Sequence, residues 1–289
     1  MKGIILAGGK GSRLSPLTLG VTKQLLPVYN KPVIYYPLSI LMLLGIQDIL
    51  IITNPEDITS FDRLLGNGKN FGINIKYAKQ ENPNGIAEAF IIGESFIEKD
   101  NVCLILGDNI FFGNGLIECL QNGIINENGS HIFAYEVNDP ERYGVVEFDK
   151  NNKVISLEEK PKNPKTNYAV PGIYFFDNRV SSFAKNLQPS KRGELEITDL
   201  EKMYLAEETL TVSEIERGIA WLDVGTHESL LQAGNFIETI EERQGVMVGC
   251  LEEIALDKGF IGKEKLENII CQMPDNKYKM YLQKLLRRK

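Results

Sequence analysis

The sequence predicts an α/β fold built on a mainly parallel mixed sheet that helices cover on both faces. Through the first half of the chain, short apolar runs rich in β-forming residues alternate with helical patterns. From about His131 the pattern changes to strands separated by Asn, Asp, Pro and Gly turns, and after Thr226 it becomes almost wholly helical. Repeated strand-helix order is what a parallel sheet requires, because each parallel pair needs a crossover connection.

The first half supplies the parallel part of the predicted sheet. Strands are expected at residues 3–6, 48–53, 73–78 and 102–106, and helices at residues 34–44, 58–65 and 86–97. Ligands of parallel sheets bind at the carboxyl ends of the strands. The loops after Leu6, Ala78 and Leu106 are therefore expected to converge on one crevice.

The second half supplies an antiparallel elaboration that roofs this crevice. Strands are expected at residues 132–137, 144–148, 154–158 and 172–176. Residues 149–152 read Asp-Lys-Asn-Asn, a sequence typical of a hairpin turn. Helical periodicity is expected again over residues 263–289, with basic residues in the last turn.

A glycine-rich loop follows the first strand and indicates nucleotide binding. Three glycines in four positions, at 8, 9 and 11, let backbone N–H groups approach a phosphate, and Arg13 adds a forked cation. A dinucleotide-binding fingerprint would need Gly where Leu14 stands and an acid about 20 residues later. The P-loop string is also absent. These departures argue against an NAD-linked oxidoreductase and against a P-loop kinase. If the loop is considered without the rest of the sequence, a glycine turn that joins a strand to a helix stays an alternative.

Two aspartates and several cations are candidates for phosphate chemistry. Asp108 and Asp223 each end an apolar run, and together they would hold Mg²⁺ against substrate phosphates if the fold brings them close. Taken singly, each aspartate fits a turn or helix cap equally well. Lys23 lies in an apolar, proline-bounded segment and Lys160 directly follows a strand, so both are candidates for binding phosphates. Arg192 is a supporting candidate, since neighbouring acids could simply pair with it.

Composition narrows the class of protein further. The chain has 289 residues and a net charge of −7, which argues against non-specific binding to nucleic acids or anionic membranes. The four cysteines show no CxxC spacing, and no signal peptide or membrane-spanning stretch is recognisable, so a soluble cytoplasmic chain with reduced thiols is expected. His131 and His227 are interpreted as structural or solvated.

Six motifs in order resemble those of the sugar-1-phosphate nucleotidylyltransferases, most closely the short-type glucose-1-phosphate thymidylyltransferases. They are GGKGSRL at 8–14, TKQLLP at 22–27, KPVIYYP at 31–37, LGDN at 106–109, EEKP at 158–161 and WLDVGT at 221–226. The resemblance extends from Met1 to about Gly245. Lys10 and Ser12 depart from the residues common in the family, without threatening the phosphate loop.

The resemblance implies a three-layer Rossmann-like nucleotidyltransferase fold with a helical C-terminus. Residues 1–235 would form the α/β domain, with a nucleotide-binding part at 1–130 and a sugar-phosphate-binding part at 131–235; residues 236–289 would serve subunit contacts or regulation in a homotetramer. The implied reaction is the Mg²⁺-dependent condensation of dTTP with α-D-glucose 1-phosphate to dTDP-glucose and pyrophosphate. A UTP-glucose-1-phosphate uridylyltransferase stays an alternative, because thymine and uracil differ by one methyl group. The second alternative is a non-catalytic protein that senses sugar nucleotides.

The resemblance also implies roles for individual residues. The catalytic group would be Arg13, Lys23 and Lys160, and the metal ligands would be Asp108 and Asp223. The nucleotide would be bound by Leu6, Gly8, Gly9, Gly11, Ser12, Arg13, Gln80, Pro83, Gly85 and Asp108, with Gln80 and Gly85 recognising thymine. The sugar phosphate would be bound by Asn109, Tyr143, Gly144, Glu159, Lys160, Val170, Gly172 and Arg192. No general base is expected, because the sugar phosphate is already an anionic nucleophile.

Overall fold

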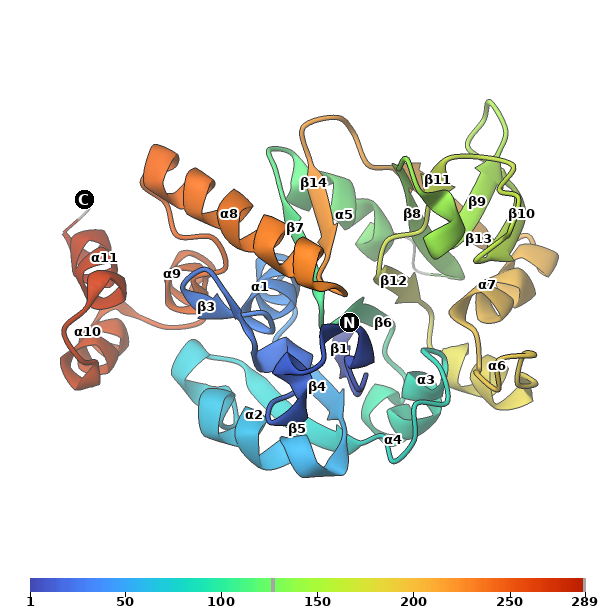
Figure 1. Cartoon of the computed structure of the whole chain (residues 1–289). Coiled ribbons are helices and arrows are strands. Elements are labelled where there is room, and N and C mark those ends of the chain that lie inside the picture. Colours follow the sequence, from blue (N-terminus) through green and yellow to red (C-terminus); the bar gives the residue numbers. More distant parts are fainter. Residues whose placement is uncertain (126–127, 288–289) are drawn as a thin grey trace.

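The computed structural model describes residues 1–125 and 128–287 and is organised around a ten-stranded mixed sheet with helices on both faces (Figure 1). Four strands form its parallel part in the order β5-β4-β1-β6. They are β1 (Lys2–Ala7), β4 (Asp48–Thr53), β5 (Asn74–Lys79) and β6 (Val102–Leu106). The α/β class and the parallel part predicted from the sequence are thus confirmed.

The antiparallel part continues from β6. Strand β12 runs antiparallel to β6 and to β8, and β11, β9 and β10 extend the sheet beyond β8, while β13 pairs parallel to β8. These strands are β8 (Ser130–Glu136), β9 (Gly144–Phe148), β10 (Val154–Glu159), β11 (Tyr168–Ala169), β12 (Ile173–Phe176) and β13 (Leu210–Glu214). The predicted hairpin turn at residues 149–152 is confirmed between β9 and β10.

Two further strand pairs lie outside the large sheet. The antiparallel pair β7 (Asn109–Phe112) and β14 (Ala220–Asp223) matters most, because it joins segments more than a hundred residues apart. The other pair is β2 (Pro27–Val28) with β3 (Lys31–Pro32). The β7–β14 pairing was not predicted from the sequence.

The parallel strands are buried on both faces, so alternate residues contribute to two separate cores. Ile5 and Ile105 belong to the core under α1 (Tyr35–Leu43), α2 (Ile58–Leu65) and α5 (Leu116–Ile125). Ile4 and Leu104 belong to the core on the opposite face. The helices of that face are α3 (Glu88–Ile92), α4 (Glu94–Ile97), α6 (Val180–Asn186) and α7 (Ile197–Ala206). The three layers that this creates agree with the predicted architecture.

The helix predicted at 86–97 is instead two short helices, α3 and α4. The break occurs at Gly93, whose φ of −83° and ψ of 1° leave the helical region. A Cβ at this position would stand 3.0 Å from Cδ1 of Ile4 in the first strand. Close packing of the chain on the sheet therefore replaces a continuous helix here.

The C-terminal part is helical, as predicted. Helix α8 (His227–Gln244) begins at a capping box in which Thr226 and Ser229 bond each other's backbone. It is followed by α9 (Leu251–Asp257), α10 (Lys263–Gln272) and α11 (Lys277–Leu286), and Figure 1 shows α10 and α11 at one end of the molecule. The last two residues of the predicted helical segment lie outside the described residues. None of the helices described has the length and apolarity needed to cross a membrane.

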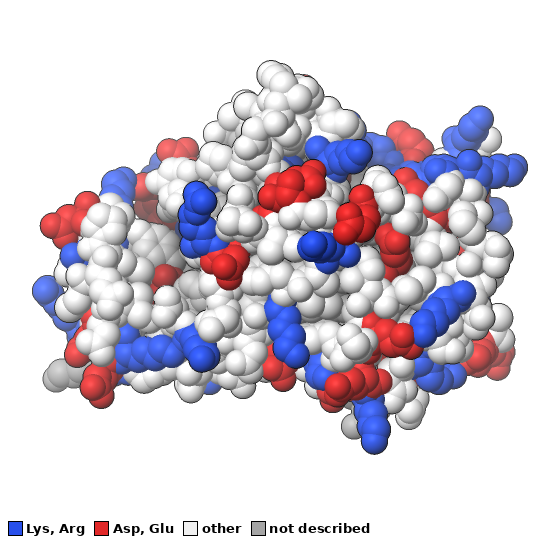
Figure 2. Space-filling model, turned by 90° about the horizontal axis from the view of Figure 1, so that it is seen from below, with Lys and Arg blue, Asp and Glu red and all other residues white. Residues whose placement is uncertain are grey.

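Charges on the surface are mixed in sign. On the face drawn in Figure 2, Lys and Arg side chains alternate with Asp and Glu side chains and do not gather into one patch of a single sign. A nucleic-acid-binding face would instead carry clustered cations. This face gives no support to nucleic-acid binding, in line with the net charge of −7.

Candidate active site

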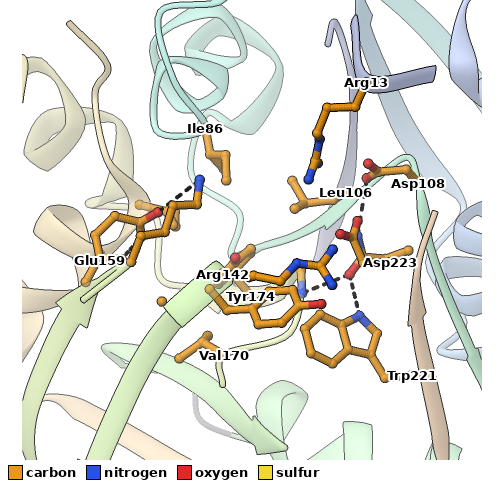
Figure 3. A pocket seen from close by; sticks show the side chains of 17 residues that line it. Arg13, Ile86, Leu106, Asp108, Arg142, Glu159, Val170, Tyr174, Trp221 and Asp223 are labelled. Carbon is orange, nitrogen blue, oxygen red and sulfur yellow. Dashed lines mark hydrogen bonds and ion pairs between the residues drawn. The ribbon is translucent and has the colours of Figure 1, made fainter. Parts of the chain in front are cut away.

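A cavity of about 390 Å³ lies between the carboxyl ends of the parallel strands and the antiparallel part, and it collects many of the predicted site residues. Those that line it are Arg13, Asp108, Asn109, Tyr143, Gly144, Glu159, Lys160, Val170, Gly172 and Asp223. Its size is typical of a small-molecule site. Figure 3 shows Asp108 and Asp223 side by side near Arg13, with Glu159 on the opposite side of the cavity.

The two predicted metal ligands meet because β14 pairs with β7. This pairing sets Asp223 opposite Asn109, and the N–H of Val224 donates to the carbonyl oxygen of Asp108 at 3.0 Å. Burial, with the neighbouring Asp108 carboxylate as the next cause, raises the pKa of Asp223 to about 6. Lys23 forms an ion pair with Asp108.

This donor set fits Mg²⁺. Two carboxylates that repel each other across a buried site are the hard oxygen ligands that Mg²⁺ takes, and a divalent cation would relieve their repulsion. No group of three or more His, Cys, Asp or Glu suited to a metal occurs among the described residues. Substrate phosphates and water would therefore complete the coordination, as is usual for this ion.

Asn109 connects Asp108 to residues on the other side of the cavity. Its Oδ1 accepts hydrogen bonds from Nε1 of Trp221 at 2.6 Å and from the backbone N–H of Gly172 at 3.1 Å. Its Nδ2 donates to Oδ1 of Asp108 at 3.2 Å. Only 1% of Asn109 is exposed. The side chain of Asn109 therefore holds Trp221, Gly172 and Asp108 in place together. Both its oxygen and its nitrogen form hydrogen bonds within the protein.

The glycine loop after β1 lies against the ends of β5 and β6, so the three loops predicted to converge do contact one another. The N–H of Gly107 donates to the carbonyl oxygen of Leu6 at 2.9 Å. A Cβ at Gly8 would lie only 2.5 Å from Oε1 of Gln80. Gly11 has a φ of +59°, which favours glycine, and starts the short 3₁₀ helix η1 (Ser12–Leu14) that carries Arg13.

The predicted thymine-binding loop packs against the antiparallel part. Gly85 has a φ of +109°, and a Cβ there would stand 2.4 Å from the carbonyl oxygen of Leu195. The N–H of Leu195 donates to the carbonyl oxygen of Asn84 at 2.6 Å. Pro83 is exposed in the same loop, and Gln80 is only 4% exposed. The cavity of 390 Å³ is not lined by these residues, nor by six other predicted ones: Leu6, Gly8, Gly9, Gly11, Ser12 and Lys23.

The side of the cavity predicted to bind the sugar phosphate is built from side chains on antiparallel strands and on α7. The hydroxyl of Thr198 donates to Oε2 of Glu159 at the end of β10. Lys160 follows with a positive φ of 44°, and its Nζ lies 3.6 Å from Oε1 of Glu159. Gly172 keeps this wall close, because a Cβ there would stand 2.6 Å from Cδ1 of Leu106.

Arg192 does not line the cavity. It is held by ion pairs to Glu196 at 2.7 Å and Glu194 at 3.0 Å, and it stands 3.5 Å from Glu159. These are the neighbouring acids that the sequence offered as competing partners. The structure therefore places Arg192 beside a site residue without bringing its guanidinium into the cavity.

Seven lining residues were not predicted from the sequence. They are Ile86, Leu106, Arg142, Tyr174, Ile197, Thr198 and Trp221. Trp221 stands in a motif that the resemblance quoted, and Arg142 directly precedes the predicted Tyr143, so both carried a local signal. Thr198 carried none, because its role depends on the packing of α7 against β10.

Comparisons with known proteins assign the family. A family model described as nucleotidyl transferase matches residues 2–240. A glucose-1-phosphate thymidylyltransferase of Neisseria meningitidis is 57% identical over 288 residues, which cover 100% of both chains. The chain belongs to the glucose-1-phosphate thymidylyltransferases of this family. A member from Mycobacterium tuberculosis is 51% identical, also over 100% of both chains.

Solved structures agree with this family membership. A candidate glucose-1-phosphate thymidylyltransferase of Bacillus anthracis, solved with sucrose, has a TM-score of 0.76 at 44% identity and covers 82% of this chain and 94% of its own. A UDP-glucose pyrophosphorylase complexed with UDP-glucose has a TM-score of 0.70 at 22% identity, covering 82% of this chain and 98% of its own. The second likeness concerns the fold alone.

Proposed function

We propose that this chain condenses dTTP with α-D-glucose 1-phosphate to give dTDP-glucose and pyrophosphate. The observation that carries the proposal is the meeting of Asp108 and Asp223 in a cavity that Arg13 enters from one side and Glu159 and Lys160 line from the other. Relatives that share more than half of their residues with the whole chain are named for this activity.

The two parts of the α/β domain divide the substrates between them. Residues 1–130 would bind the nucleotide, with the backbone of Gly8, Gly9 and Gly11 on the triphosphate. Residues 131–235 would bind the sugar phosphate through Glu159 and Lys160. Glu159 accepts from Thr198, so its carboxylate is already oriented toward a sugar hydroxyl.

The reaction needs positioning and charge neutralisation more than proton transfer. The phosphate of glucose 1-phosphate is the nucleophile, and its attack on the α-phosphate of dTTP is opposed by repulsion between anions. Lys160 would align the attacking phosphate, and Arg13 would neutralise the oxygens of the α-phosphate and the departing pyrophosphate. Mg²⁺ held by Asp108 and Asp223 would supply further neutralisation on the phosphates. Lys23, beside Asp108, would contact the phosphates from the loop side.

One assay tests the proposal directly. Pyrophosphate release is measured with dTTP and a panel of hexose 1-phosphates, with and without Mg²⁺, and UTP is added as a competitor. The expected result is release with glucose 1-phosphate that depends on Mg²⁺ and is fastest with dTTP. Release that is faster with UTP would favour the uridylyltransferase alternative, and nucleotide-sugar binding without any release would favour a sensor.

We also propose a cytoplasmic homotetramer in which residues 236–289 contribute subunit contacts. All four cysteines are free thiols, as is usual for cytoplasmic proteins. Helices α10 and α11 stand at one end of the molecule, where a second subunit could pack against them. Light scattering on the full chain is expected to give the mass of four subunits; the mass of one subunit would contradict this part of the proposal.

A further inference from the structure

The side-chain amide of Gln80 is held in one orientation. Its Nε2 donates to Oε2 of Glu88 at 2.7 Å and to the carbonyl oxygen of Gly85 at 3.3 Å. An ionised carboxylate and a backbone carbonyl both accept hydrogen bonds and cannot donate them. The amide must therefore turn its NH₂ group toward Glu88 and its oxygen away, whichever way the two atoms are assigned.

The amide oxygen faces the glycine loop. A Cβ at Gly8 would lie 2.5 Å from Oε1 of Gln80, so only a glycine permits this approach. Gln80 is 4% exposed, and within residues 1–125 and 128–287 no group donates a hydrogen bond to this oxygen. This oxygen therefore keeps its acceptor capacity for a ligand that brings an N–H group.

Glu88 is itself fixed by a second contact. Its Oε1 accepts a hydrogen bond from Nδ2 of Asn84 at 2.8 Å. It is also the first residue of α3, so its backbone is held by the helix. The carboxylate is thus anchored at both oxygens, one on the loop and one on Gln80, and it cannot turn without breaking the bond that orients the amide.

We propose that Glu88 is the positioning residue for base selection: by holding the NH₂ group of Gln80, it presents the amide oxygen of Gln80 to N3 of the base. Thymine and uracil carry an N3–H donor, whereas N3 of cytosine is an acceptor. An acceptor facing an acceptor leaves both unpaired in a buried site, which gives strong discrimination. Glu88 thereby excludes cytosine nucleotides while leaving thymine and uracil equivalent at this contact. This inference rests on the proposed function, with the base beside Gln80 as the family resemblance implies.

Two substitutions at position 88 test this role: the first replaces one of the two acceptors by a donor, and the second leaves only donors. Glu88→Gln offers one acceptor and one donor, so the amide of Gln80 can bond it in either orientation. Glu88→Lys offers donors only and would draw the oxygen of Gln80 away from the base. Glu94→Gln, on α4 and paired with Lys185, is the matched control for loss of a carboxylate.

The experiment measures equilibrium binding of dTTP, dUTP and dCTP to the full chain without sugar phosphate, followed by kcat/KM for each nucleotide. The preference for dTTP over dCTP is expected to fall roughly 10-fold in Glu88→Gln and further in Glu88→Lys, in line with loss of one oriented hydrogen bond. The preference for dTTP over dUTP, in binding and in kcat/KM, is expected to stay unchanged, since both bases carry N3–H. Glu94→Gln is expected to bind and use dTTP, dUTP and dCTP as the unsubstituted chain does.

An unchanged preference for dTTP over dCTP in both Glu88 variants, with normal dTTP binding, would overturn the inference. An equal loss of binding for all three nucleotides would mean that Glu88 has a merely structural role, and would also overturn the inference. Thermal melting of the variants identifies a general loss of stability. Absence of pyrophosphate release by the unsubstituted chain would instead overturn the proposed function, and the binding ratios would still report on Glu88.

Discussion

The side of the site proposed to bind the nucleotide (the nucleotide end) and the side proposed to bind the sugar phosphate (the sugar end) are built from different parts of the chain. The loop proposed to bind the nucleotide phosphates is built from glycines, and a Cβ at Gly8 would lie 2.5 Å from Oε1 of Gln80. At the sugar end, side chains such as Glu159 and Thr198 reach in from antiparallel strands and α7. Backbone groups hold phosphates that every nucleotide shares, whereas side chains distinguish one sugar from another. Substitutions at the two ends should therefore affect different kinetic constants.

The largest effect is expected where the two ends meet. Asp223→Asn keeps the shape of the side chain and removes one of the two carboxylates proposed to hold Mg²⁺. Activity should fall by more than about 10³-fold, because metal stabilisation of the phosphates contributes several kcal/mol. Initial rates over a range of Mg²⁺ concentrations test this, with Asp199→Asn, a partly exposed residue that does not line the cavity, as control. Near-normal rates with an unchanged Mg²⁺ requirement would remove Asp223 from the metal site.

Arg13→Ala tests the nucleotide end. Its guanidinium reaches the cavity near Asp223, where charge develops during transfer, so kcat should fall on the order of 10²–10³-fold. The KM for glucose 1-phosphate should change only a few-fold, because Arg13 does not touch the sugar wall. Steady-state kinetics with both substrates varied provides the measurement. A KM effect larger than the kcat effect would mean that the two ends are not separable in this way.

Glu159→Ala tests the sugar end. Loss of the carboxylate that Thr198 orients should raise the KM for glucose 1-phosphate by roughly 10-fold, with a smaller change in kcat. The KM for dTTP should stay unchanged. The same two-substrate kinetics distinguishes the outcomes, and equal losses in both KM values would contradict the division between the ends.

The smallest effect concerns the stability of the antiparallel part. Burial lowers the pKa of His131 on β8 to about 4, and its Nε2 has no hydrogen-bond partner. The unfolded chain takes up this proton near pH 6.5, so folding stability is full above that pH and is lost as the pH falls toward 4. Between pH 7 and 5 the loss should be about 2 kcal/mol.

Replacing His131 by Gln removes this titration. Urea unfolding at pH 7 and pH 5 should show a smaller loss of unfolding free energy for His131→Gln than for the unsubstituted chain. Equal losses in the two proteins would mean that another group governs the acid response. Activity at pH 7 should be unaffected, since His131 does not line the cavity.

The parts of the site that sequence could predict are those encoded locally. An apolar strand running into glycines and Arg13 is a continuous pattern, and the structure has the expected strand and loop there. Asp108 and Asp223 could be offered as candidates, but their meeting depends on β7 pairing with β14 across more than a hundred residues. No local pattern encodes such a pairing. Thr198 was missed for the same reason, because only the packing of α7 brings its hydroxyl to Glu159.

The shared side chain of Asn109 has a consequence for engineering the sugar preference. Nε1 of Trp221 and the backbone N–H of Gly172 both donate to the side-chain oxygen of Asn109. The amide nitrogen of the same side chain donates to Asp108. Replacing Trp221 by a smaller residue would enlarge the pocket but remove one donor to this oxygen, and so would disturb the side chain that supports Asp108. Directed evolution toward new hexose phosphates should therefore select compensating changes around Asn109, and variants that broaden the substrate range will tend to be slow before they are repaired.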